Sequence, residues 1–161
     1  MPWPARQGLT PLQQHDGANA DYLDLLDVID ENSESPSADR EELFRRIAFN
    51  YFVNNTDDHL RNHGFIRGAH GWRLSPAFDV NPNPDIDAEH ATSIDGATRR
   101  EHGFKALLGV ADHFVTMEKC EAILSGIYRA VSQWRTAAQN CKVPTAEIEL
   151  FAPLLDTRPP V

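Results

Sequence analysis

One stretch of the sequence, residues 37–55, restricts the possible fold more than any other part of the chain. Its apolar residues recur at the three- and four-residue spacing of one face of an α-helix. They are Leu43, Phe44, Ile47, Ala48, Tyr51 and Phe52. Ser37 occupies the position of a helix N-cap, and acidic residues follow it near the positive end of the helix dipole. The pattern predicts a helix that starts at Ser37 and ends near Asn54 and Asn55.

The rest of the chain predicts further helices and little β structure. Helical periodicity, β-prone runs and turn residues define the expected elements. They are a helix at 20–32, a β-hairpin at 64–74, a short strand at 92–94, and helices at 104–111, 116–140 and from Pro144 onward. Pro153 is expected to bend or end the last helix. The predicted fold class is therefore mainly α with a small β-hairpin.

The domain organisation expected from composition is simple. Residues 1–19 contain three prolines and two glycines, which predicts an irregular N-terminal segment. Residues 20–156 carry all the periodic patterns and are expected to form one domain, followed by a tail at 157–161.

Charge and composition exclude several classes of function. The net charge of −9 disfavours binding to nucleic acid, since phosphate backbones would be repelled. No apolar run reaches the roughly 20 residues that a membrane-spanning helix needs, and no signal peptide is recognised at the N-terminus. The two cysteines, Cys120 and Cys141, show no zinc or disulfide spacing, so a reducing, cytoplasmic setting is expected.

A polar run, Asn55-Thr-Asp-Asp-His-Leu-Arg-Asn-His-Gly64, follows the predicted helix directly. Phosphoryl transfer needs one carboxylate to orient the attacking hydroxyl and oxygen ligands to hold Mg²⁺ against the phosphates. Asp57 and Asn62 lie five positions apart, as the base and the metal-binding asparagine of protein kinases do. The predicted hairpin comes next and Asp79 follows it. This order of loop, hairpin and aspartate makes the pattern specific, whereas Asp-x4-Asn alone would occur by chance in many chains.

Two motifs resemble those of the HipA family of bacterial toxin kinases. Residues 54–62, Asn-Asn-Thr-Asp-Asp-His-Leu-Arg-Asn, resemble the family's catalytic loop, where a run like N-x-D-x-H-x-K-N follows an aromatic-rich helix. Residues 74–79, Leu-Ser-Pro-Ala-Phe-Asp, resemble its L-x-P-x-Y-D metal-binding segment. The resemblance covers roughly residues 20–155 and implies the C-terminal lobe of a protein-kinase-like fold.

The resemblance also implies a role for each matching residue. Asp57 would be the catalytic base, and Asn62 and Asp79 would bind Mg²⁺ and so hold ATP, the phosphate donor. Arg61 would lie near the transferred phosphate. His59 would brace the backbone of the loop. The implied reaction is transfer of the ATP γ-phosphate to a serine or threonine of a protein linked to translation.

The sequence departs from a complete kinase of this family. No glycine-rich loop precedes Asp57, and the first lysine is Lys105. The ATP-gripping N-terminal lobe is therefore expected to be absent, either because the chain is a fragment or because a separate polypeptide supplies that lobe. By resemblance, an antitoxin of the HipB type is the other expected partner.

Two other functions are compatible with the sequence. A non-catalytic binding module could keep the fold of the lobe without turnover. A metal-dependent hydrolase would instead use Asp57, His59, His63 and Asp79.

Several residues have simpler interpretations. Asp57 and Asp58 could cap a helix end, and Asp79 could belong to an Asx turn. Cys120, Trp72 and Trp134 are expected to pack in or near the core. The remaining histidines singled out are expected at the surface; they are His90, His102 and His113.

Overall fold

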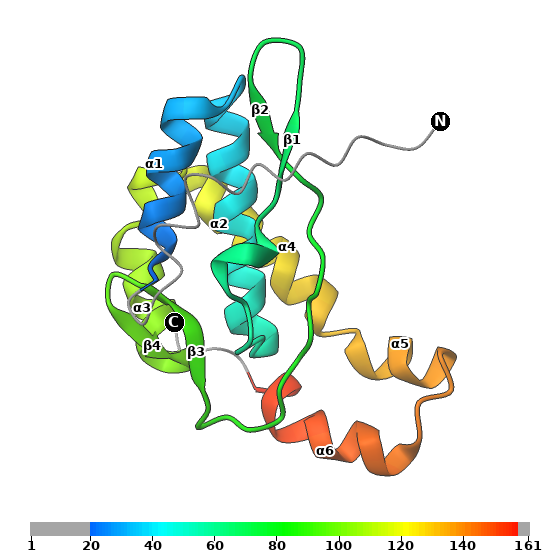
Figure 1. Ribbon diagram of the computed structural model, residues 1–161. Coiled ribbons are helices and arrows are strands. Elements are labelled where there is room, and N and C mark those ends of the chain that lie inside the picture. Colours follow the sequence, from blue (N-terminus) through cyan, green and yellow to red (C-terminus); the bar gives the residue numbers. More distant parts are fainter. Residues whose placement is uncertain (1–19, 158–161) are drawn as a thin grey trace.

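The computed structural model describes residues 20–157, so the segments 1–19 and 158–161 lie outside the described residues. Helices α1 (Tyr22–Asn32) and α2 (Pro36–Val53) pack antiparallel to each other, with α2 in the middle of the molecule (Figure 1). Asp21 caps α1 in a capping box with Asp24. The predicted cap at Ser37 is wrong, because α2 starts at Pro36 with Ser35 before it. Proline is favoured in the first turn of a helix, because the N–H that it lacks would have no acceptor within the helix there.

Two small antiparallel sheets flank these helices. The predicted hairpin is confirmed as β1 (Phe65–Arg67) and β2 (Trp72–Leu74), with Phe65 opposite Leu74. The expected short strand is the end of a longer one, β3 (Glu89–Ile94), which pairs with the unpredicted β4 (Ala97–Arg99). Asp95 and Gly96 join β3 to β4, and both have positive φ, 49° and 75°. This is the backbone geometry of a tight two-residue hairpin turn.

The second half of the described chain is helical, as predicted, with different boundaries. Its elements are α3 (Arg100–Gly109), η3 (Ala111–His113), α4 (Met117–Val131), α5 (Trp134–Asn140) and α6 (Thr145–Leu155). Thr116 caps α4 as expected, by accepting a hydrogen bond from the Lys119 N–H. The prediction of one helix over 116–140 is wrong, since α4 ends at Val131. The Ser132 hydroxyl there donates to the Arg129 carbonyl, a local bond that competes with helix continuation.

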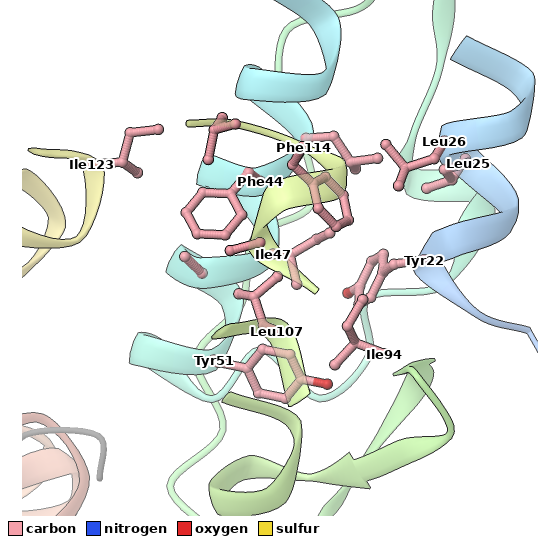
Figure 2. Packing of buried hydrophobic residues seen from close by; sticks show 14 of the residues in the cluster. Tyr22, Leu25, Leu26, Phe44, Ile47, Tyr51, Ile94, Leu107, Phe114 and Ile123 are labelled. Carbon is pink, nitrogen blue, oxygen red and sulfur yellow. The ribbon is translucent and has the colours of Figure 1, made fainter. Parts of the chain in front are cut away.

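The core lies where α2 meets α1, α3, α4 and the inner face of β3 (Figure 2). Phe44, Ile47 and Tyr51 of α2 are fully buried within it. Phe44 lies beside Phe114, with ring centroids 5.9 Å apart. Arg100 of α3 donates hydrogen bonds to the Tyr51 and Phe52 carbonyls, which satisfies the C-terminal end of α2. The end of α2 is thereby fixed, and the polar run of the sequence begins there.

Asp39 attaches the hairpin to α2. Its buried carboxylate accepts hydrogen bonds from the Ser33 hydroxyl at 2.6 Å and from the Leu74 N–H at 3.2 Å. The Arg73 guanidinium contributes a third bond at 3.1 Å. Because β2 leads directly into the segment that carries Asp79, these bonds fix where that segment starts.

Single-residue predictions have mixed outcomes. Cys120 is buried as expected, at 3% exposure, and Trp72 and Trp134 are partly buried. His102 and His113 are exposed. The prediction for His90 is wrong, because its ring is buried and lies 4.3 Å from that of Tyr51. Pro153 lies inside α6, which ends two residues later. Within residues 20–157 no helix combines the length and apolarity needed to cross a bilayer.

Candidate functional site

The candidate catalytic loop begins where α2 ends in a left-handed residue. Asn54 has φ 54° and ψ 47°, and its N–H bonds to the Asn50 carbonyl. The Asn55 N–H bonds to the same carbonyl at 2.8 Å. Asparagine adopts this conformation more readily than most residues, and it is a common way to end a helix. The chain therefore leaves α2 in a fixed direction, and Leu60, 1% exposed, anchors the far side of the loop in the core.

Within this loop the Asn62 side chain lies against the backbone of Asp57. The Asn62 amide nitrogen donates to the Asp57 carbonyl at 3.4 Å, across the short 3₁₀ turn η2 (Leu60–Asn62). Asn62 is buried, whereas the side chain of Asp57 is exposed. An exposed carboxylate backed by an ordered loop is available to a hydroxyl group arriving from solvent.

Asp58 is the structural centre of the loop, a role that the sequence did not reveal. Its carboxylate accepts hydrogen bonds from the Tyr22 hydroxyl, from the Asn50 amide at 2.6 Å and from His63 Nε2 at 2.9 Å. All four residues are buried. The bonds join α1, α2 and both ends of the loop. Asp58 therefore fixes the backbone next to Asp57.

The charge state of this cluster follows from its contacts. Burial alone would raise the pKa of Asp58, but the hydrogen bond and charge of His63, with the Tyr22 bond, outweigh it and lower the pKa. Burial and the Asp58 carboxylate raise the pKa of Tyr22 well above its usual value. Asp58 is therefore an ionised acceptor and Tyr22 a protonated donor at neutral pH.

Strand β3 supports the loop from the opposite side. The Thr92 hydroxyl donates to the Asp58 carbonyl at 2.7 Å. The Ala91 N–H donates to the Thr56 carbonyl at 2.8 Å. The backbone on both sides of Asp57 is thus held by neighbouring structure.

Asp79 lies on the long segment between β2 and β3, which runs along α2 (Figure 1). It has φ 58°, and its Oδ1 accepts a bond from the Asn81 amide at 2.9 Å. The Asn81 N–H in turn donates to Asn55 Oδ1 at 3.3 Å. Asn81, two positions after Asp79, is therefore in direct contact with Asn55, two positions before Asp57.

Further bonds tie the same segment to the start of the loop. The Asn83 N–H donates a hydrogen bond to the Asn54 carbonyl at 3.0 Å. The Asn54 amide donates to the carbonyls of Asn83 and Asp85 at 2.9 and 2.8 Å. The Asn83 amide donates to the Thr56 hydroxyl at 2.8 Å. The loop with Asp57 and the segment with Asp79 thus form one hydrogen-bonded unit.

Comparison with known proteins agrees with the motifs in this unit. The sequence matches the HipA-like C-terminal domain over residues 6–151, most of the chain. The chain belongs to this family. A Haemophilus influenzae protein named "Putative kinase" is 37% identical over 70 residues, which is 40% of this chain and 20% of that protein. The chain thus matches about a fifth of that relative's length, and the family and this relative together indicate a kinase-related protein.

The remaining predicted site residues of this HipA-like domain lie on the same loop. Arg61 is exposed in η2. His59 precedes η2, and its Nδ1 is buried without a hydrogen-bond partner among residues 20–157. His63, by contrast, is hydrogen-bonded to the loop through the Asp58 carboxylate. A bracing role for His59 stays a prediction.

The donor set of the HipA-like site suits Mg²⁺ better than zinc. Among residues 20–157, no three His, Cys, Asp or Glu side chains are grouped so that they could hold a metal ion. A hydrolase based on Asp57, His59, His63 and Asp79 therefore has no support in the described residues. Mg²⁺ needs fewer protein ligands, since one or two hard oxygens with phosphate and water complete its shell. The Asn62 amide and the Asp79 carboxylate supply hard oxygens of this kind.

Proposed function

We propose that this chain is the catalytic lobe of a HipA-type kinase that transfers the ATP γ-phosphate to a serine or threonine of a protein. The observation that supports this most is the hydrogen-bonded unit formed by the Asp57 loop and the Asp79 segment, through Asn55 and Asn81 at 3.3 Å. Two stretches separated by a hairpin in sequence are held together, as a shared phosphate site requires. A protein-kinase-like lobe is the fold that the proposal implies.

Asp57 is the proposed base. Its exposed carboxylate would orient the substrate hydroxyl and accept its proton during transfer. The bonds to Asp58 and Thr56 hold the backbone on either side and so limit the positions that this carboxylate can take. Arg61, exposed in η2 of the same loop, would offset negative charge on the transferred phosphate.

Asn62 and Asp79 are the proposed ligands of Mg²⁺. The bond from the Asn62 amide nitrogen to Asp57 occupies the donor end of that amide, so its oxygen is the end that would bind the cation. Oδ1 of Asp79 accepts from Asn81, so Oδ2 is the oxygen proposed for the ligand role. When bound, the cation would neutralise charge on the phosphates.

The wider biological role is proposed from the family resemblance. The chain would act in the bacterial cytoplasm as part of a toxin–antitoxin pair and phosphorylate a protein linked to translation. Its partners would be an antitoxin of the HipB type or a polypeptide that supplies an N-terminal lobe. The acidic net charge of −9 argues against direct contact with nucleic acid.

The test is transfer of radiolabelled phosphate from ATP to a serine- or threonine-containing protein, with the chain joined to an ATP-binding lobe. Asp57→Asn is expected to lower the rate by about 10²–10⁴-fold, because the base and its orientation are both lost. Asp112→Asn, at an exposed aspartate of η3, is the matched control and should leave the rate unchanged.

Equal rates for Asp57→Asn and the unchanged chain would exclude Asp57 as the base. Binding of Mg-ATP with no transfer at all would favour the alternative, a non-catalytic binding module.

A further inference from the structure

A cavity of about 550 Å³ lies between α2 and α4, next to the candidate site. Residues 77–80 form one side of it. Most of its wall is apolar, and the largest apolar side chains are Phe49, Phe78, Val80, Ile123 and Ile127. This volume and lining are those of sites for small organic ligands, which combine an apolar wall with a few polar groups.

The acidic residues at the cavity are already paired. Glu41 accepts a bond from Lys119 at 2.6 Å, which lowers the pKa of Glu41, and also contacts Arg45 at 3.1 Å. Glu42 pairs with Arg45 at 3.2 Å and with Arg46 at 2.9 Å. The carboxylates of Glu41 and Glu42 therefore have cationic partners. Asp58, the third acidic residue of the lining, accepts hydrogen bonds from Tyr22, Asn50 and His63.

Arg46 is the polar group whose bonds are incomplete. Its side chain lines the cavity and is only 8% exposed. Nε donates to Glu42, and Nη2 donates to the Ser75 carbonyl. Nη1 is buried and has no acceptor among residues 20–157. Burial of a cationic donor without an acceptor is unfavourable, so an acceptor supplied by a ligand would be stabilised there.

We propose that this cavity binds a small amphipathic carboxylate, with its apolar body between α2 and α4 and its carboxylate on Arg46. A charged acceptor is favoured over a neutral one because guanidinium–carboxylate bonds are about twice as strong as neutral bonds. Asn62 and His63 also line the cavity, so the ligand would lie beside the candidate catalytic loop. Binding itself needs neither ATP nor phosphate transfer and is independent of the proposed kinase activity.

Gly126 offers a way to block the cavity without harming the fold. It lines the cavity in the interior of α4, and a Cβ built on it would meet nothing within 4 Å. A larger side chain at this position would occupy the cavity instead of the core. Leucine also has a higher helix propensity than glycine, so Gly126→Leu should fold.

The experiment is an NMR titration of the 161-residue chain with octanoate, and with octanamide as the neutral probe of the same length. We expect saturable octanoate binding that shifts signals of α2 and α4 and is at least tenfold tighter than octanamide binding. Gly126→Leu should weaken octanoate binding at least tenfold. Gly109→Leu, at another glycine with open space around it and away from the cavity, should leave binding unchanged.

Arg46→Gln tests the charge preference, since it should bring octanoate and octanamide to similar affinities. The proposal is overturned if the unchanged chain shows no saturable octanoate binding, or if Gly126→Leu binds octanoate as well as the unchanged chain does. Preference for the carboxylate that survives in a folded Arg46→Gln chain would also overturn it. Should Arg46→Gln fail to fold, the comparison of octanoate binding by Gly126→Leu and Gly109→Leu decides the result.

Discussion

Asp58 illustrates how one buried side chain can determine the conformation of an exposed neighbour. Its carboxylate is shared by Tyr22, Asn50 and His63, residues from two helices and the end of the loop. Asp57, one position earlier, has an exposed side chain. The two adjacent aspartates therefore have separate roles, one in structure and one in the proposed chemistry.

We predict that Asp58→Ala lowers the free energy of unfolding by about 3 kcal/mol, because three buried donors lose their acceptor. Urea denaturation followed by circular dichroism measures this. Asp57→Ala is the matched control and should change stability by less than about 0.5 kcal/mol, as exposed substitutions usually do. Equal losses for the two variants would contradict the separation of roles.

His90 predicts a dependence of stability on pH. Burial lowers its pKa to about 4 from an ordinary value near 6.5, while the unfolded chain keeps the ordinary value. Between these values the unfolded state binds more protons than the folded state, so stability falls as the pH falls from 6.5 towards 4. The loss attributable to this residue is up to about 3 kcal/mol.

In His90→Gln, the decrease in unfolding free energy between pH 7 and pH 4.5 should be smaller than in the unchanged chain. His102→Gln removes an exposed histidine and should keep the full decrease. An identical pH profile for His90→Gln and the unchanged chain would show that His90 does not titrate as its burial requires.

At the scale of elements, the contact between α2 and α3 depends on a glycine. A Cβ at Gly103 of α3 would overlap the ring and hydroxyl of Tyr51 on α2. Tyr51 is fully buried and its ring packs against that of His90, so a shift of the ring would displace neighbouring side chains. The close approach brings Arg100 of α3 to the C-terminal carbonyls of α2, where the candidate loop begins.

Gly103→Ala is therefore predicted to lower thermal stability, with a loss of about 1–3 kcal/mol from overpacking that exceeds the gain in helix propensity. Scanning calorimetry measures this. Gly109→Ala in the same helix, where a Cβ meets nothing within 4 Å, should be neutral or slightly stabilising. A more stable Gly103→Ala chain would contradict the proposed packing.

At the scale of the whole molecule, local patterns predicted the elements better than the contacts between them. The helix over residues 37–55 could be predicted because its buried face repeats at helical spacing, and the HipA-like motifs marked Asp57, Asn62 and Asp79 because their order is visible in sequence. The strand β4 was missed although Asp95-Gly96 is a turn signal. The end of α4 at Val131 was missed because the helical composition continues beyond it.

Long-range contacts explain the other differences. Tyr22 and Asp58 are 36 positions apart, and no local spacing indicates that one bonds the other. His90 was predicted at the surface because the sequence shows no obvious partner for it, yet β3 carries it against Tyr51. The bond between Asn55 and Asn81 likewise joins two loops whose residue types predict only turns.

The claim that Asp57, Asn62 and Asp79 surround one divalent cation can be tested directly by paramagnetic relaxation. Mn²⁺, added with ATP in place of Mg²⁺, should broaden the amide signals of residues 57–62 and 79–81 together in the NMR spectrum of the chain, and Asp79→Asn should reduce the broadening in both segments. Broadening confined to one segment, with the other unaffected at the same Mn²⁺ concentration, would contradict a shared site.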